Sequence, residues 1–195
     1  MPVSVRFYFD FVSPYSYLAF TQLPRVARAT GASFELVPIS VLDLMQRVGN
    51  TPTSVTCQAK SRYAREDLDR WARRYGVPLV PHPAFGSFDV EPFLVAAHSA
   101  ARSGCLEACV AAVFEAIWVE SRNLTDESAV TEWFRSAGVD ADVLREDAAA
   151  GREALAACVD QALVDGVFGV PSFRTDDALF FGNDRLDFLE AALRS

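Results

Sequence analysis

The chain has 195 residues, of which 51% are hydrophobic, and a formal net charge of −8 at pH 7. This length fits one large domain or a domain with an insertion, and the apolar content is ample for a core. The acidic balance disfavours non-specific binding to nucleic acid or to an anionic membrane, although an anionic small molecule needs only local positive charge.

The start of the chain reads as a strand, a helix and a second strand. Ser13 and Pro14 form a helix-start signal, because serine caps free amides and proline suits the first turn. The helix is expected to run to about Thr30 and to end at Gly31, and a second strand is expected at 33–39. The first strand is indicated by the alternating apolar residues Val3, Val5, Phe7 and Phe9. This order predicts a β-α-β unit with a parallel sheet.

The middle of the chain reads as an all-helical block. A charged amphipathic helix is predicted over 60–75, where Gly76 would end it, and a proline-rich loop follows. Further helical patterns lie at 92–101, 106–118, 127–137 and 141–149. Their apolar stripes are interpreted as core.

The end of the chain returns to mixed structure. A helix is predicted at 152–164, followed by two short strands at 172–174 and 179–181 and by a closing helix at 184–193. This layout is that of an α/β, thioredoxin-like fold with a large all-helical insertion. We expect residues 1–40 and 152–195 to form the thioredoxin-like domain and residues 41–151 to form the inserted helical domain.

The cysteines and histidines give no sign of a metal site. The four cysteines include no Cys-x-x-Cys pair, and the two histidines leave few ligands for zinc. Cys105 and Cys109 would share a helix face as small packed residues, and His98 would be packed or partly exposed. His82 lies between two prolines and could line a pocket.

No apolar stretch approaches the roughly 18 residues of a membrane span. The N-terminus also lacks the pattern of a signal peptide. We therefore expect a cytoplasmic protein without a membrane or nucleic-acid partner.

Ser13 stands at the strand–helix junction, where a thioredoxin-type redox enzyme would place a cysteine. It could act only as an N-cap, worth about 1 kcal/mol. It could instead donate a hydrogen bond to a thiolate brought by a ligand. Lowering a thiol pKa by about two units requires roughly 2.7 kcal/mol. A hydrogen bond to a charged group (roughly 1.5–3 kcal/mol) and a helix terminus (roughly 0.3–2 kcal/mol) suffice together.

Two segments near the C-terminus also have two interpretations each. The Val170-Pro171 peptide bond could be trans, with the proline serving only at the edge or turn of a strand. It could instead be cis and present the Val170 backbone to a peptide-like ligand. The segment of Gly182, Asn183 and Asp184 could simply cap the last helix. Alternatively, free amides there could bind a carboxylate while Asp184 binds an ammonium group.

Asn50 and Lys60 alone would be read as a turn residue and a solvated helix residue. One ligand with a thiol, a carboxylate and an ammonium group would use all of these features. Glutathione is such a ligand.

In their order and spacing these motifs resemble the 2-hydroxychromene-2-carboxylate isomerase family. That family is related to kappa-class glutathione transferases and, more distantly, to DsbA-type oxidoreductases. The resemblance covers nearly the whole chain. It rests on Phe-Asp-x-x-Ser-Pro-Tyr-Ser from Phe9, Asn50-Thr51-Pro52, Lys60 with Tyr63, Asp67-Leu68, Arg70-Trp71-Ala72, Gly-x-Pro from Gly76, and Phe-Gly-Asn-Asp-Arg from Phe181.

The resemblance implies a catalytic Ser13 that faces the sulfur of glutathione. Asp67 would take part from this chain or from a neighbouring subunit, since relatives are dimers. The implied substrate is a small aromatic carboxylate, because the family interconverts 2-hydroxychromene-2-carboxylate and trans-o-hydroxybenzylidenepyruvate by transient thiolate addition. The implied glutathione contacts are Asn50, Thr51, Lys60, Val170, Pro171, Gly182, Asn183 and Asp184.

Two departures from the family pattern concern the second substrate. Thr53 follows Pro52 where the family has another proline, and residues 85–91 lack a Phe-Pro-x-Asn pattern. This loop is expected to shape the aromatic pocket. The alternatives are a kappa-type glutathione transferase and a non-catalytic glutathione-binding module. A disulfide oxidoreductase is disfavoured because residues 13–16 contain no cysteine.

Overall fold

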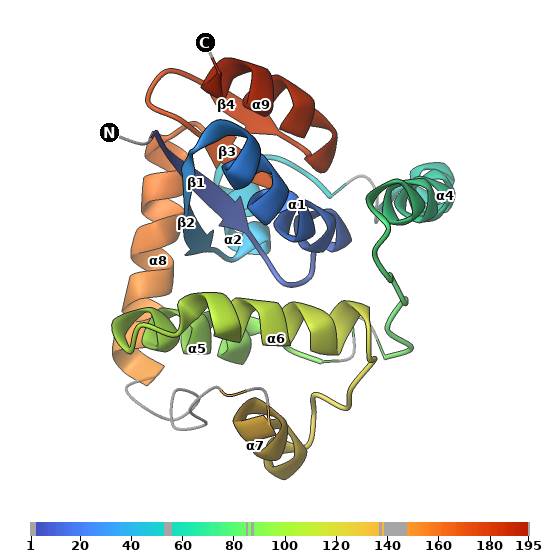
Figure 1. The fold of residues 1–195 in the computed structure, drawn as a ribbon. Coiled ribbons are helices and arrows are strands. Elements are labelled where there is room, and N and C mark those ends of the chain that lie inside the picture. Colours follow the sequence, from blue (N-terminus) through green and yellow to red (C-terminus); the bar gives the residue numbers. More distant parts are fainter. Residues whose placement is uncertain are drawn as a thin grey trace.

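The computed structural model describes residues 3–52, 56–84, 86, 88–136, 138 and 148–194. Within these residues the strands form one sheet in the order β2-β1-β3-β4 (Figure 1). β1 (Ser4–Phe9) pairs parallel with β2 (Ser33–Pro38) and antiparallel with β3 (Ser172–Arg174). β3 in turn pairs antiparallel with β4 (Leu179–Phe181). The predicted β-α-β unit and thioredoxin-like sheet are confirmed.

The alternation along β1 divides the core between the two faces of the sheet, because successive side chains of a strand point to opposite faces. Val5, Phe7 and Phe9 join the cluster that contains α1 (Pro14–Thr30) and α9 (Leu186–Leu193). Tyr8 joins a second cluster, formed with residues of α2 (Val41–Arg47) and α8 (Ala148–Val164).

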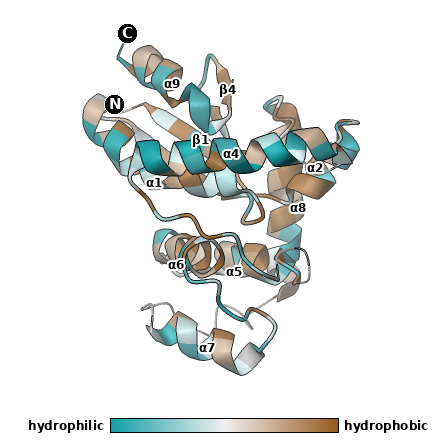
Figure 2. Ribbon diagram, turned by 90° about the vertical axis from the view of Figure 1, so that its right-hand side faces the viewer, coloured by the Kyte–Doolittle hydropathy of each residue, from teal (hydrophilic) through white to brown (hydrophobic). Residues whose placement is uncertain are grey.

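The helical block lies below the sheet in Figure 1. It contains α5 (Glu91–Arg102), α6 (Leu106–Trp118) and α7 (Glu127–Ser136). α4 (Gln58–Tyr75) lies apart from them, against α1, and is largely hydrophilic (Figure 2). Ala72 is its one buried residue in the described region.

An aromatic cluster joins the helical block to the sheet. The ring of Phe114 on α6 lies 5.5 Å from Phe9 and 5.1 Å from Phe11. The indole Nε1 of Trp118 donates to the carbonyl of Phe11 at 3.0 Å. The division into residues 1–40 with 152–195 and residues 41–151 remains a proposal, and α8 runs unbroken across its second boundary.

Several element boundaries differ from the sequence-based expectation. The short helix α2 was not predicted, and α8 begins at Ala148, before the predicted start. The predicted closing helix divides into a 3₁₀ turn, η2 (Asn183–Arg185), followed by α9. Most of the helix predicted at 141–149 lies outside the described residues.

Both histidines serve local structure. His98 Nε2 lies 3.1 Å from the carbonyl of Pro38, and burial lowers the pKa of His98. His82 is buried, with Nε2 2.8 Å from the carbonyl of Arg122 and its ring against Phe88. In the described part of the chain, no group of three or more His, Cys, Asp or Glu residues could hold a metal ion. No described helix has the length and apolar character to cross a membrane.

Candidate functional site

Ser13 caps α1 and still has a proton to donate. Its Oγ accepts a hydrogen bond from the amide of Ser16 at 3.1 Å, and its own amide donates to the carbonyl of Asp10 at 3.1 Å. A hydroxyl has one donor and two acceptor positions, so the cap occupies one lone pair and leaves the O–H available. The capping role is confirmed. The two interpretations of Ser13 are therefore compatible.

A second serine in the same turn, Ser16, ends the Phe-Asp-x-x-Ser-Pro-Tyr-Ser motif, but the sequence predicted no role for it. Ser16 is fully buried, and its Oγ has no hydrogen-bond partner among the described residues. A buried polar group without a partner is costly and calls for a physical explanation. The first turn of α1 therefore holds a capping hydroxyl, an unpartnered hydroxyl and the positive end of a helix dipole.

Asp10 links this turn to α2. Its buried carboxylate accepts hydrogen bonds from the amide of Val12 at 3.1 Å and from the amide of Val41 at 2.8 Å. Burial raises the pKa of Asp10 to about 6, while the two amide bonds act in the opposite direction. Asp10 thus fixes the segment that leads into Ser13.

In the loop before β3, the backbone of Val170 is unpaired within the described residues, while the carbonyls of neighbouring residues are hydrogen-bonded. The Val170–Pro171 peptide bond is cis, which is the second of the two interpretations that the sequence left open. The amide and carbonyl of Val170 have no hydrogen-bond partner in the described part of the chain. The flanking carbonyls are all engaged: Phe168 accepts from Asn50 Nδ2 at 2.9 Å, Gly169 from Ser172 Oγ at 2.8 Å and Pro171 from the amide of Gly182 at 2.9 Å. The Val170 backbone is thereby left for an extended partner.

The sheet register brings this loop towards the start of α1. Tyr8 and Ser172 are opposite each other in the antiparallel pair of β1 and β3. The chain leaving β1 leads to Ser13, and the chain entering β3 comes from Val170 and Pro171. Since paired antiparallel strands run side by side, these two segments emerge at the same edge of the sheet.

Asn50, in the segment after α2, is hydrogen-bonded to this loop. Its side chain is exposed, and its Oδ1 accepts a hydrogen bond from the amide of Thr51 at 2.8 Å while Nδ2 holds Phe168. Asn50 and Thr51 are thus brought next to the segment that carries Val170. This contact shows how Asn50 positions the loop.

The start of the last helical region combines a buried amide with a carboxylate. Asn183 is buried, and its Nδ2 has no partner among the described residues. The Asp184 carboxylate is partly exposed and lies 2.7 Å from Arg185. No side chain caps η2 or α9, so neither carboxamide nor carboxylate is used for capping. A Cβ on Gly182, whose φ is 105°, would lie 2.3 Å from Asp184 Oδ1, so a side chain at this position would displace Asp184.

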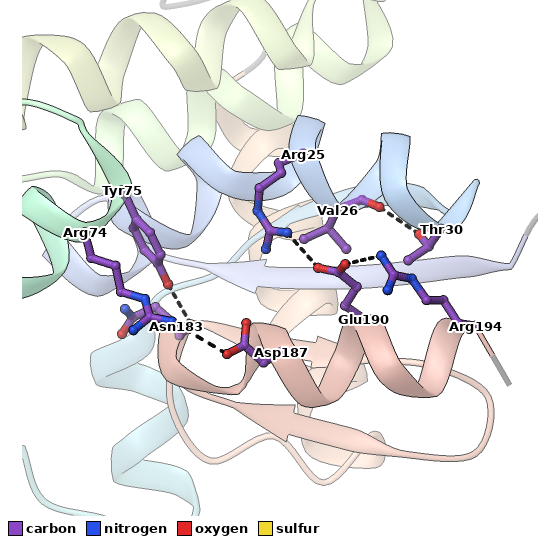
Figure 3. Close-up of polar contacts among 9 residues, drawn as sticks. All are labelled: Arg25, Val26, Thr30, Arg74, Tyr75, Asn183, Asp187, Glu190 and Arg194. Carbon is purple, nitrogen blue, oxygen red and sulfur yellow. Dashed lines mark hydrogen bonds and ion pairs between the residues drawn. The ribbon is translucent and has the colours of Figure 1, made fainter.

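Two tyrosines attach α4 to the site. Tyr15 OH donates to Asp67 Oδ2 at 3.1 Å, and Tyr75 OH donates to the carbonyl of Asn183 at 3.0 Å (Figure 3). Burial raises the pKa of Tyr15, and the nearby Asp67 acts in the same direction. Asp67 therefore has a partner within its own chain.

Lys60 lies on α4, the helix that also carries Asp67. It is exposed near the start of α4, and Asp67 follows it by seven positions, which is about 10 Å along a helix axis. The other predicted residues come together through the bonds and the register described above. Lys60 belongs to the helix that carries Asp67 and Tyr75.

Comparison with known proteins agrees with this architecture. The family model of the DSBA-like thioredoxin domain matches residues 4–194. The chain is 39% identical over 196 residues to the 2-hydroxychromene-2-carboxylate isomerase of Sphingobium xenophagum, with 99% of each protein covered. It is 25% identical over 204 residues to glutathione S-transferase kappa 2 of Caenorhabditis elegans, covering 95% of this chain and 91% of the relative.

The structural comparison gives the same assignment. The solved structure of a 2-hydroxychromene-2-carboxylate isomerase superposes with a TM-score of 0.86 at 30% identity, covering 97% of this chain and 94% of the other. The similarity thus extends over both the sheet and the helical block. This chain belongs to the DSBA-like thioredoxin-domain family and, within it, to the 2-hydroxychromene-2-carboxylate isomerases.

Proposed function

We propose that this chain is a glutathione-dependent isomerase that interconverts 2-hydroxychromene-2-carboxylate and trans-o-hydroxybenzylidenepyruvate in the breakdown of aromatic compounds. The observation that carries the proposal is the pairing of a free Ser13 O–H at a helix N-terminus with an unpartnered Val170 backbone at the same sheet edge. The relatives named as isomerases support the reaction, and the kappa transferase relative supports glutathione as the thiol.

The residues present fit a tripeptide thiol. Val170 offers one free amide and one free carbonyl, which suit the peptide groups around a cysteine. The unpartnered Nδ2 of buried Asn183 is a donor that lacks an acceptor, and the Asp184 carboxylate is an acceptor for an ammonium group. The exposed ammonium of Lys60 would meet the carboxylate at the other end of the tripeptide.

Ser13 would act by stabilising an anion and not as a nucleophile. Bound glutathione would supply a thiolate that adds reversibly to the conjugated chain of the substrate. The addition would turn a double bond into a single bond, which allows rotation before the thiolate is expelled. Ser13 would donate its proton in a hydrogen bond to the sulfur, and the first turn of α1 would add its dipole. The proton itself stays on Ser13 Oγ throughout.

The test follows isomerisation spectroscopically at catalytic concentrations of glutathione. The proposal expects turnover that needs glutathione and leaves its concentration unchanged. Turnover that is independent of glutathione would contradict it.

A kappa-type glutathione transferase is the second candidate, favoured by the transferase relative. A chlorinated nitroaromatic acceptor separates the two activities, because transfer consumes the thiol in proportion to product. Binding of glutathione without turnover in either assay would instead indicate a non-catalytic module.

We also retain two expectations as proposals: that the chain is a homodimer and that it acts in the cytoplasm. Sedimentation of the purified protein tests the first, and fractionation of the producing cells tests the second. A monomer would leave Asp67 without a role towards a neighbouring subunit.

A further inference from the structure

Tyr75, the last residue of α4, reaches across to the start of the last helical region. Its hydroxyl donates to the carbonyl of Asn183 at 3.0 Å, over a separation of 108 residues (Figure 3). The Tyr75 ring packs against Trp71, with centroids 5.3 Å apart. Arg74 lies over Trp71 and 4.0 Å from Asp187. The end of α4 thus holds one defined peptide group beside the site.

That peptide group belongs to the residue with the unpartnered donor. Asn183 is buried, so the free Nδ2 of its side chain marks a place where an acceptor is missing. Fixing the carbonyl of Asn183 restricts the direction of its side chain and of the peptide that leads to Asp184. Through this one hydrogen bond, Tyr75 therefore helps to orient both the Nδ2 donor of Asn183 and the carboxylate of Asp184.

We propose that Tyr75 is a positioning residue that sets the preference of the site for the γ-glutamyl end of glutathione. This inference rests on the proposed function. The γ-glutamyl group carries a carboxylate and an ammonium group on one carbon, which suit the amide of Asn183 and the carboxylate of Asp184. The thiol of glutathione would lie near Ser13, away from its γ-glutamyl end. Tyr75 would therefore affect binding of the γ-glutamyl end and not the reacting sulfur.

Tyr75 is able to play this part throughout the working pH range. Burial raises its pKa above the ordinary value of 10.0, so the hydroxyl keeps its proton and remains a donor. The nearby charges of Asp187 and Arg74 act in opposite directions on it. The contact with Asn183 therefore does not depend on a titration near neutrality.

The experiment compares glutathione with cysteinylglycine, which lacks the γ-glutamyl residue, in the wild-type chain and in Tyr75→Phe. Loss of one positioning hydrogen bond is expected to raise the KM and the dissociation constant for glutathione about five- to tenfold. The kcat and the constants for cysteinylglycine should change by less than about twofold, because binding energy and not the transition state is affected.

Tyr17→Phe is the matched control. Tyr17 also donates its hydroxyl to a backbone carbonyl, that of Pro78 at 2.7 Å, from a buried position on α1. The same substitution there should lower stability comparably and leave the preference for glutathione unchanged. A purely structural role of Tyr75 would make the two variants behave alike.

A second variant shows whether Tyr75 acts through Asn183. Asn183→Ala should lose the same preference, and the double variant should lose no more than either single one, since both changes remove one coupled unit. A retained preference in Tyr75→Phe, or an equal loss for both thiols, overturns this inference alone. A wild-type chain that binds neither thiol overturns the proposed function and this inference with it.

Discussion

Ser13→Ala would remove the hydroxyl whose lone pair caps α1 and whose proton has no acceptor among the residues that the structure describes. The variant loses two separable contributions. Loss of the cap costs about 1 kcal/mol of stability. Loss of the donor costs roughly 1.5–3 kcal/mol of thiolate stabilisation, which raises the pKa of the bound thiol by about 1.1–2.2 units.

The sign and size of the catalytic effect follow from that shift. A bound thiol with a pKa about two units below its free value of roughly 8.5 is about three-quarters ionised at pH 7. Raising that pKa by about 1.1–2.2 units leaves roughly 20% to 2% as thiolate. We therefore expect turnover at pH 7 to fall by at least about fourfold, with a modest loss of glutathione affinity and with recovery of activity at higher pH.

The assay is a pH titration of the thiolate absorbance of bound glutathione, together with the pH dependence of kcat. Ser40→Ala serves as a control, because Ser40 caps α2 in the same way by accepting from the amide of Asp43 at 3.4 Å. It should lower stability without moving the thiol pKa. An unchanged thiol pKa in Ser13→Ala would refute the assigned role of Ser13.

Three further predictions concern the groups around the site. The pKa of Asp10 is raised from 3.8 to about 6, so folding becomes less favourable as pH rises through this interval. The stability advantage of the wild type over Asp10→Asn should shrink by about 2 kcal/mol between pH 4 and pH 7 in urea unfolding, and a constant difference would contradict the burial argument. Tyr8→Phe removes a 2.5 Å hydrogen bond to the buried Asp165 carboxylate, and thermal unfolding should show a loss of roughly 1.5–3 kcal/mol. Gly182→Ala would force Asp184 aside, so calorimetry should find weaker glutathione binding, and unchanged affinity would disprove that Asp184 is a contact.

The parts of the fold that sequence could predict are those with local causes. The alternation in β1 and the capping residues Ser13 and Gly31 act on their neighbours, so the first β-α-β unit is readable without the rest of the chain. The helix α2 was missed because seven residues give too short a pattern. It is held by its Ser40 cap and by the distant carboxylate of Asp10.

The candidate site was predicted in part for the same reason. Ser13 carries a local signal, whereas the bonds that arrange the site join residues far apart in sequence. Tyr75 and Asn183 are 108 residues apart, and Asn50 and Phe168 are 118 residues apart. Nothing in the pattern of α4 distinguishes Tyr75 from an ordinary apolar contact, so its hydroxyl bond emerges only from the folded chain.

The contact of Trp118 with the carbonyl of Phe11 has a practical consequence. The indole is bonded to the peptide two residues before Ser13, so the natural fluorescence of this tryptophan should be sensitive to what happens at that turn. Binding of glutathione beside Ser13 could then be followed without attaching a dye. Exchanging Trp71 and Trp133 for phenylalanine would leave Trp118 as the single tryptophan in the chain.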